Sequence, residues 1–166
     1  MIGEEVVLTD MLMCREHRAD IQNSLIEKYH CPIISFCMNI PGPVKTNKQI
    51  RAAFDSGKEL LLATLSKHNT VIKEAFEIHE KTGDEILLAV SYPAEKIKEL
   101  TTEIEENHPF GRLFDMDVIN TDGMKLSRGS YRKCIICGCQ AQECARTRKH
   151  TVAEMQEKIE EMLGRE

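Results

Sequence analysis

The sequence predicts an α+β fold, a ferredoxin-like β-α-β-β-α-β sandwich with an N-terminal helix and a C-terminal Cys3His knuckle followed by a helix. Three observations predict this fold. Residues 113–118 alternate between two sets of side chains, as a half-buried strand does. Apolar residues at helical spacing occupy 48–67 and 94–107, and apolar or alternating strand-like segments flank both. Four of the seven cysteines lie within residues 134–144.

The first half of the chain opens with a helix and a strand. Thr9 or Asp10 caps a predicted helix that runs to about Lys28. Residues 32–40 form a strongly apolar strand, and 41–47 form a rigid Pro-Gly-Pro loop that ends in a helix cap. The residues expected on the apolar side of the first helix are Met11, Leu12, Ile21, Leu25 and Ile26.

The second half of the predicted sandwich starts at the helix 48–67. Strands 71–79 and 85–92 are expected to form a hairpin. A helix over 94–107 then leads to the strand that contains residues 113–118, and 124–127 is expected to return as a short strand. The residues expected on the buried side of helix 48–67 are Ile50, Ala53, Phe54, Leu60, Leu61 and Leu65.

The length of the chain bounds its organisation. Its 166 residues suffice for one domain with a real core and a small appendage. The expected division is an α+β, nucleotidyltransferase-like part over 1–127 and a knuckle-like segment with a helix over 128–166, packed on the first part.

Composition points to a cytoplasmic protein. No apolar run approaches the roughly 18–20 residues that span a bilayer, and the N-terminus lacks the basic start of a secretory signal. Seven cysteines are an odd number, and their crowding favours reduced thiols and metal binding over a disulfide framework. No membrane partner is expected.

Charge is distributed unevenly along the chain. Residues 124–150 hold seven Lys or Arg and one Glu, a net charge of +6, so the remainder of a chain whose total is −5 carries −11. A polyanionic partner is therefore expected to meet the molecule at or near this basic segment.

Asp115 and Asp117 are the first candidates for catalysis. Because side chains alternate along a strand, both point to the face opposite Phe114, Met116 and Val118. Two carboxylates two residues apart repel each other unless a cation lies between them or one is protonated. Such a pair suits Mg²⁺, which binds one or two carboxylates together with water and substrate phosphates.

Several basic side chains are candidates for holding phosphates near this pair. Arg112 precedes the aspartates and is suited to grip a phosphate with two hydrogen bonds. In the predicted topology the first and last strands are antiparallel neighbours, which brings Lys45 to the same place and leaves the aspartates on the open face. Arg15 and Arg18 lie one turn apart on the first helix. For both arginines the alternative is a solvated basic face, and for Lys45 it is a plain turn.

The C-terminal cysteines have the spacing of a metal site. Cys134, Cys137, Cys144 and His150 follow the pattern Cys-x2-Cys-x6-Cys-x5-His, which matches a closed tetrahedral zinc site. The alternative is a group of reduced cysteines without metal. Cys139 is a spare thiol that either substitutes for a ligand or plays no part. A closed zinc site has a structural role, here to hold the basic residues in place, among them Arg128, Arg146 and Arg148, which are candidates for binding the substrate.

These stretches together resemble the apo-citrate lyase phosphoribosyl-dephospho-CoA transferase family, the holo-acyl-carrier-protein synthases of citrate lyase. The resemblance extends over nearly the whole chain. It rests on His108 to Val118, Leu126-Ser127-Arg128, the Cys134/Cys137/Cys144/His150 segment with Ala145-Arg146, Arg15 in a Cys-Arg-Glu-His-Arg run, and the loop from Pro41 to Lys45.

The resemblance implies a nucleotidyl transfer. Triphosphoribosyl-dephospho-CoA would lose pyrophosphate, and its phosphoribosyl-dephospho-CoA portion would be joined to a serine of the citrate lyase acyl-carrier (gamma) subunit. Asp115 and Asp117 would hold Mg²⁺ against the triphosphate, and Arg112 and Lys45 would balance charge on the leaving pyrophosphate. The general base is an aspartate or, as a weaker candidate, His108.

Two other functions remain open from the sequence. One is the same transfer to another carrier, such as that of malonate decarboxylase. The other is a zinc-knuckle module that binds nucleic acid. Nucleic acid is the weaker choice, because such modules usually stack bases on aromatic side chains and only Tyr131 lies near the cysteines.

Overall fold

The computed structural model describes residues 1–164. Its elements follow the predicted order. They are α1 (Leu8–Tyr29), β1 (Ile33–Met38), α2 (Lys48–Lys67), β2 (Val71–Glu80), β3 (Gly83–Ser91), α3 (Ala94–Asn107), the 3₁₀ turn η1 (Gly111–Leu113), β4 (Phe114–Ile119), α4 (Ala141–Arg146) and α5 (Val152–Leu163).

The four strands form one antiparallel sheet in the order β2-β3-β1-β4. The predicted pairing of the first strand with the last is confirmed, with Cys37 opposite Asp115 and Ser35 opposite Asp117. β4 is therefore an edge strand, and its outer side has no strand partner.

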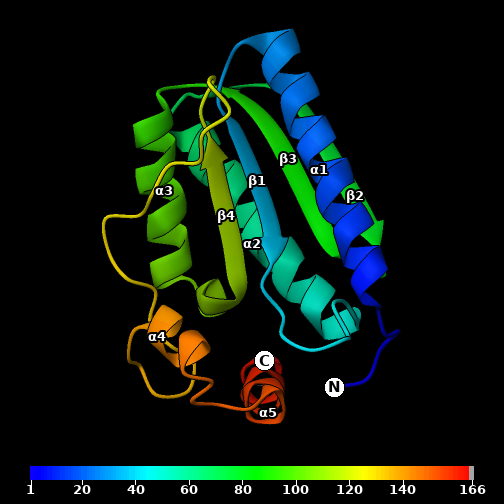
Figure 1. Cartoon of the computed structure of the whole chain (residues 1–166). Coiled ribbons are helices and arrows are strands. Elements are labelled where there is room, and N and C mark those ends of the chain that lie inside the picture. The colour runs from blue at the N-terminus through cyan, green and yellow to red at the C-terminus, as the bar shows by residue number, and fades with distance from the viewer. Residues whose placement is uncertain (165–166) are drawn as a thin grey trace.

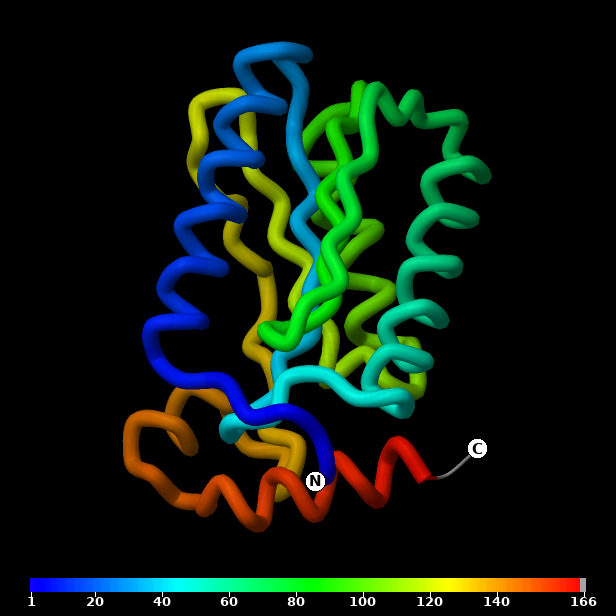
Figure 2. The backbone as a smooth tube through the Cα atoms, turned by 90° about the vertical axis from the view of Figure 1, so that its right-hand side faces the viewer, coloured from blue at the N-terminus to red at the C-terminus, as the bar shows by residue number. Residues whose placement is uncertain are grey.

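The molecule has three layers through the sheet. Helices α2 and α3 cover one face of the sheet and α1 lies across the other. Helix α5 lies at the bottom of the molecule in both views (Figures 1 and 2). The main core lies between the sheet and α2 and α3. There Phe36 stacks on Phe54 with ring centroids 4.9 Å apart and meets the edge of Phe114 at 5.1 Å. Phe114, Met116 and Val118 are fully buried in this core, as predicted.

The opposite face of the sheet is only partly open, which differs from the prediction. A second apolar cluster, which includes Leu25, Ile33 and Leu87, packs α1 against β1 and β3. Leu25, Ile21 and Ile26, which were expected on the apolar side of α1, belong to this cluster or pack against it. As a result, α1 forms one wall beside the aspartates of β4, and Leu12, which was expected on the apolar side, is 47% exposed.

The predicted bounds and buried sides otherwise hold closely, with three further local exceptions. Helix α1 begins at Leu8, because the carboxylate of Asp10 accepts a hydrogen bond from the N–H of Val7. Leu60 is exposed rather than buried. The expected return strand over 124–127 is reduced to one bridge, between Ile119 and Lys125. Side chains of α3 bond to the backbone of Met116 in the middle of β4, on its outer edge. The returning segment therefore pairs only with the end of the strand.

The C-terminal segment packs on the rest of the chain through α5. Ile159 and Leu163 are buried in a third cluster, together with Ile50 of α2 and Leu113 of η1. Thr151 and Glu154 form a capping box that starts α5. The division of the chain after residue 127 stays a prediction. Over the residues described, no helix combines the length and apolar character needed to cross a membrane.

Candidate active site and metal centre

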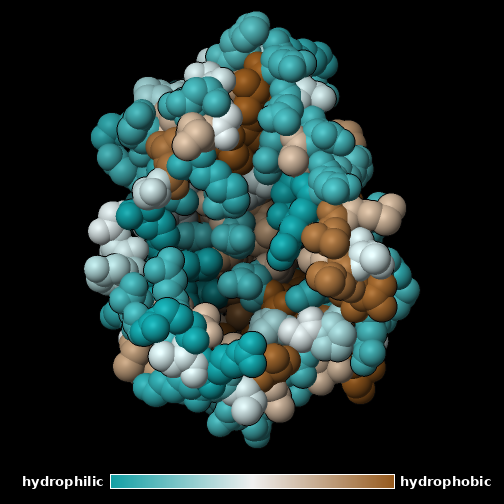
Figure 3. All heavy atoms as spheres, viewed as in Figure 1, coloured by the Kyte–Doolittle hydropathy of each residue, from teal (hydrophilic) through white to brown (hydrophobic). Residues whose placement is uncertain are grey.

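Asp115 and Asp117 lie side by side on β4 and face the α1 side of the sheet. The strand alternates between buried and half-buried residues because its apolar row enters the core below α2 and α3. Cys37 and Ser35 of β1 lie opposite the two aspartates and share their face. This face is hollowed near its centre, and hydrophilic side chains surround the hollow (Figure 3). The local geometry therefore places the two carboxylates on one side of the strand, as the alternation predicted.

Within the described part of the chain, each carboxylate forms an ion pair with one cationic side chain. Nη1 of Arg132 lies 3.6 Å from Oδ1 of Asp115, whose side chain is 43% exposed. Lys125 forms an ion pair with Asp117. The pKa of Asp115 is raised, mainly by burial and to a smaller extent by repulsion from Asp117. A divalent cation between the two carboxylates would relieve their mutual repulsion, and such a pair suits the ligand preference of Mg²⁺.

The sequence reasoning did not single out Lys125 or Arg132 as partners of the aspartates. Lys125 reaches Asp117 because the turn after β4 folds back to make the Ile119–Lys125 bridge. Arg132 reaches β4 because the segment after that turn runs along the strand's outer edge, where the Arg132 guanidinium also donates to the carbonyl of Phe114. The path of such a segment depends on tertiary contacts, so hydrophobic periodicity did not indicate that either residue contacts the aspartates.

Arg18 is held by a buried carboxylate. Its Nε and Nη2 donate to the two oxygens of Glu85 at 2.5 and 2.7 Å, and Glu85 is 2% exposed. Cys14 donates to the same carboxylate at 3.0 Å. One turn further along α1, Gln22 donates to Ser35 at 3.1 Å. This row ties α1 to the strands beside the aspartates, and the guanidinium of Arg18 is already engaged by its two hydrogen bonds to Glu85.

Arg15 and Lys45 lie near each other with their charges uncompensated. Nζ of Lys45 donates to the carbonyl of Ile40 at 2.7 Å. Burial and the nearby charge of Arg15 lower the pKa of Lys45. Among the residues that the structure describes, neither cation forms an ion pair with a carboxylate. Two unpaired cations at one place are suited to an anionic ligand.

Arg112 and Arg128 converge with Arg132 around Glu105 of α3. Nη2 of Arg128 lies 3.6 Å from Glu105, and Nη2 of Arg132 lies 3.9 Å from it. Arg112 donates to the carbonyl of Lys133, which ties η1 to the start of the knuckle. Burial, together with repulsion from Arg132 and Arg128, lowers the pKa of Arg112. These three arginines therefore link the knuckle, α3 and the beginning of β4.

His108 lies away from the two aspartates. Its Nδ1 accepts a hydrogen bond from the N–H of Phe110 at 3.0 Å, and its Nε2 lies 3.0 Å from the hydroxyl of Ser56 on α2. Its ring packs against Phe114, whose side chain enters the core on the opposite face from Asp115. The acceptor role of Nδ1 leaves the proton on Nε2, so this histidine serves as a neutral structural bridge.

Cys134, Cys137, Cys144 and His150 come together as their spacing predicted. One ligand atom from each lies within 4.8 Å of all the others. In a tetrahedral zinc site with Zn–S bonds of about 2.3 Å, ligand atoms lie roughly 4 Å apart, so this group needs little adjustment. Nε2 of His150 is buried and has no hydrogen-bond partner among the described residues, as suits a ligand atom. The donor set therefore fits a zinc ion.

The remaining basic residues of the knuckle point to solvent. Arg146 pairs with Glu143 at 2.9 Å and its side chain is 73% exposed. Arg148 is exposed and has a left-handed backbone, with φ of 50°. Cys139 is outside the four-residue group, and its Sγ lies 4.0 Å from Nζ of Lys149. Arg146 and Arg148 thus form part of an exposed basic surface.

Comparison with known proteins gives matches over almost the whole chain. The family model described as apo-citrate lyase phosphoribosyl-dephospho-CoA transferase matches residues 6–166. A protein of that name from Escherichia coli O7:K1 is 33% identical over 163 residues, which covers 96% of this chain and 89% of the relative. One from Citrobacter koseri is 33% identical over 162 residues, which covers 95% of this chain and 88% of the relative.

Proposed function

The chain belongs to the apo-citrate lyase phosphoribosyl-dephospho-CoA transferase family, and from this membership we propose that it transfers the phosphoribosyl-dephospho-CoA group to apo-citrate lyase. The donor is triphosphoribosyl-dephospho-CoA, and the acceptor is a serine hydroxyl of the acyl-carrier (gamma) subunit. The serine oxygen attacks the phosphorus next to the ribosyl group, the bond from that phosphorus to pyrophosphate breaks, and pyrophosphate leaves. The serine proton passes to a carboxylate of the site.

The observation that carries this proposal is the paired placement of Asp115 and Asp117 on one face of β4, in a chain of this family. Two adjacent carboxylates fit the ligand preference of Mg²⁺, and this ion, when bound there, would offset charge on the triphosphate. With His108 on the other face, the proton acceptor is one of these carboxylates.

The basic side chains around the site have complementary roles in the proposal. Arg15 and Lys45 lack carboxylate partners in the described part of the chain and are suited to bind phosphate groups of the donor. Arg132 and Lys125 lie beside the aspartates and can balance charge that develops on the leaving pyrophosphate. Arg112 and Arg128 support this region from η1 and from the segment after β4.

A bound zinc ion completes the proposal. Cys134, Cys137, Cys144 and His150 would hold it in a closed site, where its role is structural because no position is open for water. Arg132 lies two residues before Cys134, so a folded knuckle fixes the position of this arginine near Asp115.

The mass of the carrier subunit provides the test. Purified protein is incubated with the donor, Mg²⁺ and either the citrate lyase carrier or the malonate decarboxylase carrier, and each carrier is examined by intact-mass spectrometry. We expect the citrate lyase carrier to gain one phosphoribosyl-dephospho-CoA group and the other carrier to remain unmodified. A carrier serine changed to alanine is the control. Modification of the malonate decarboxylase carrier alone would assign the chain to that complex, and modification of neither would refute the proposal.

A further inference from the structure

The outer edge of β4 is protected by hydrogen bonds from outside the sheet. β4 ends the strand order, so the backbone groups of alternate residues point away from β1. The carbonyl of Phe114 accepts from Arg132, and the carbonyl of Val118 accepts from the N–H of Leu126 at 2.9 Å. Between these two lies Met116, whose backbone bonds to α3.

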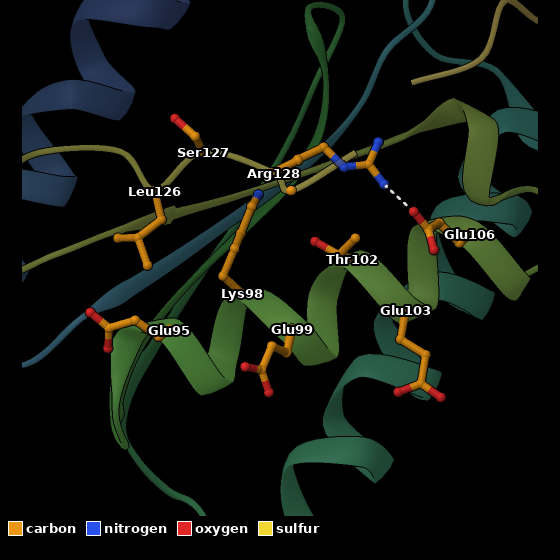
Figure 4. A pocket seen from close by; sticks show the side chains of 10 residues that line it. Glu95, Lys98, Glu99, Thr102, Glu103, Glu106, Leu126, Ser127 and Arg128 are labelled. Carbon is orange, nitrogen blue, oxygen red and sulfur yellow. Dashed lines mark hydrogen bonds and ion pairs between the residues drawn. The ribbon is translucent and has the colours of Figure 1, made fainter. Parts of the chain in front are cut away.

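Both backbone groups of Met116 are bonded by charged side chains. Its N–H donates to Oε1 of Glu105 at 2.8 Å, and its carbonyl accepts from Nζ of Lys98 at 3.1 Å. Lys98 and Glu105 are seven residues apart on α3, two helical turns, so they share one side of that helix. Figure 4 shows Lys98 rising from α3 toward the strand above it, while Glu99 and Glu103 point away.

The two side chains are buried at a cost. Lys98 is 9% exposed and Glu105 is 5% exposed. Burial lowers the pKa of Lys98 and raises the pKa of Glu105, which means that each group gives up solvation to occupy this place. Hydrogen bonds from charged groups are roughly twice as strong as those between neutral groups, so this pair restrains the backbone of Met116 firmly.

We propose that Lys98 and Glu105 are positioning residues, which fix Asp115 and Asp117 by holding the backbone of Met116 between them. This inference rests on the proposed function. Met116 separates the two aspartates, and its side chain is anchored in the core on the other face. Because both backbone groups of Met116 are restrained, the carboxylates before and after it keep their mutual orientation. A misplacement of about 1 Å in an active site costs on the order of a hundredfold in rate.

Arg132 extends this restraint to one carboxylate directly. Its guanidinium lies 3.9 Å from Glu105 and 3.6 Å from Asp115. The charges of Arg128 and Arg132 favour the ionised form of the Glu105 carboxylate, whereas its burial opposes ionisation. Glu105 therefore orients both the strand backbone and the arginine that faces Asp115.

The experiment compares two substitutions of one residue. Glu105→Gln keeps an oxygen that can accept from the N–H of Met116, whereas Glu105→Met has a similar size and only a weakly accepting sulfur. We expect Glu105→Met to lower kcat by about a hundredfold with little change in the KM of the donor or the carrier. Glu105→Gln should keep kcat within about tenfold of the unchanged protein because the bond to Met116 survives.

A matched core variant separates positioning from stability. Ile104 lies beside Glu105 on α3 and is buried, so Ile104→Val weakens the helix–sheet packing without touching the bonds of Met116. It should lower Tm and leave kcat unchanged. Lys98→Met, which removes the other bond, replaces Glu105→Met if that variant does not fold. Equal kcat in Glu105→Met and Glu105→Gln, or an equal loss of kcat in Ile104→Val, would overturn the proposal.

Failure of the proposed function would be recognised separately. It appears as absence of transfer by the unchanged protein, whereas the positioning role is read from ratios between variants. In that case the same variants are compared by calorimetric titration with Mn²⁺ in place of Mg²⁺. We expect weaker binding by Glu105→Met than by Glu105→Gln. Equal affinities, or no Mn²⁺ binding by the unchanged protein, would overturn the positioning role.

Discussion

Nη1 of Arg132 lies 3.6 Å from Oδ1 of Asp115, and the same arginine is two residues from Cys134. This contact joins the cysteine cluster to the aspartates of β4 through a short stretch of chain. The carbonyl of Lys133, between them, accepts from Arg112 of η1, so the start of the knuckle is tied to the start of β4 at two points. Disorder in the knuckle would therefore displace Arg132 and disturb its contact with Asp115.

Removal of one carboxylate tests the proposed role of the pair. Asp115→Asn and Asp117→Asn should each lower transfer to the background rate, because an amide is a poor ligand for Mg²⁺ and does not accept a proton. Intact mass of the carrier at saturating Mg²⁺ measures the outcome, and unaltered circular dichroism shows that the fold is kept. Normal turnover in both variants would exclude the pair from catalysis.

The same substitution at Asp115 makes a prediction about stability. Burial and Asp117 raise the pKa of this carboxyl in the folded state, so the folded protein binds its proton more readily than the unfolded chain does. That contribution to stability is present below the ordinary aspartate pKa of 3.8 and is lost as pH rises through the raised pKa. Asp115→Asn has no such loss. The Tm of this variant minus that of the unchanged protein should therefore be larger at pH 7 than at pH 3. A smaller difference at pH 7 than at pH 3 would contradict the raised pKa.

Zinc content provides a test of the metal centre. Protein purified without added metal should contain one zinc per chain by elemental analysis. Cys144→Ser should lower both zinc content and Tm, because Cys144 is buried and a structural zinc site contributes to folding. Cys139→Ser is the matched control, since Cys139 is exposed and outside the group of four, and it should change neither quantity. Equal zinc content in both variants would exclude Cys144 as a ligand.

The sequence predicted most of the fold because hydrophobic periodicity reports which face of each element is buried. The alternation around Asp115 and Asp117 was enough to place both on one face of their strand, and the cysteine spacing was enough to predict the four-residue group. The position of α1 was not predicted. Its apolar side was, since Ile21, Leu25 and Ile26 pack in the second cluster, but a local pattern does not say which face of the sheet that side covers.

The residues that support the site were harder to predict. Lys98 and Glu105 share the buried side of α3 with Ile97 and Ile104, and charges within an apolar stripe were a signal that went unused. Arg132 gave no comparable signal, because its contact with Asp115 depends on how the segment after β4 crosses the strand. Periodicity is local information, and such a crossing is set by tertiary contacts.

His108 allows a test of the structural role assigned to it. Its Nδ1 accepts from the N–H of Phe110, and the side-chain oxygen of Asn is placed to do the same. We expect His108→Asn to reduce kcat by much less than the roughly hundredfold or more that loss of a general base causes. Its Tm should fall, because the contacts with Ser56 and Phe114 are lost. A loss of kcat beyond a hundredfold, with normal zinc content and circular dichroism, would instead show that His108 takes part in catalysis.

Reversal of two exposed charges tests where the carrier binds. The proposed acyl-carrier partner is expected to be acidic, and residues 124–150 carry a net +6. Arg146→Glu combined with Arg148→Glu should raise the KM of the carrier more than that of the donor, because like charges then repel. The effect should shrink toward roughly 0.5 M salt, where the screening length is about 4 Å. Lys96→Glu with Lys158→Glu is the matched control, since each of these lysines, like Arg146, pairs with a glutamate three residues away. If the donor KM rises instead and the carrier KM does not change, Arg146 and Arg148 bind the triphosphate, and the knuckle belongs to the active site rather than to a docking surface.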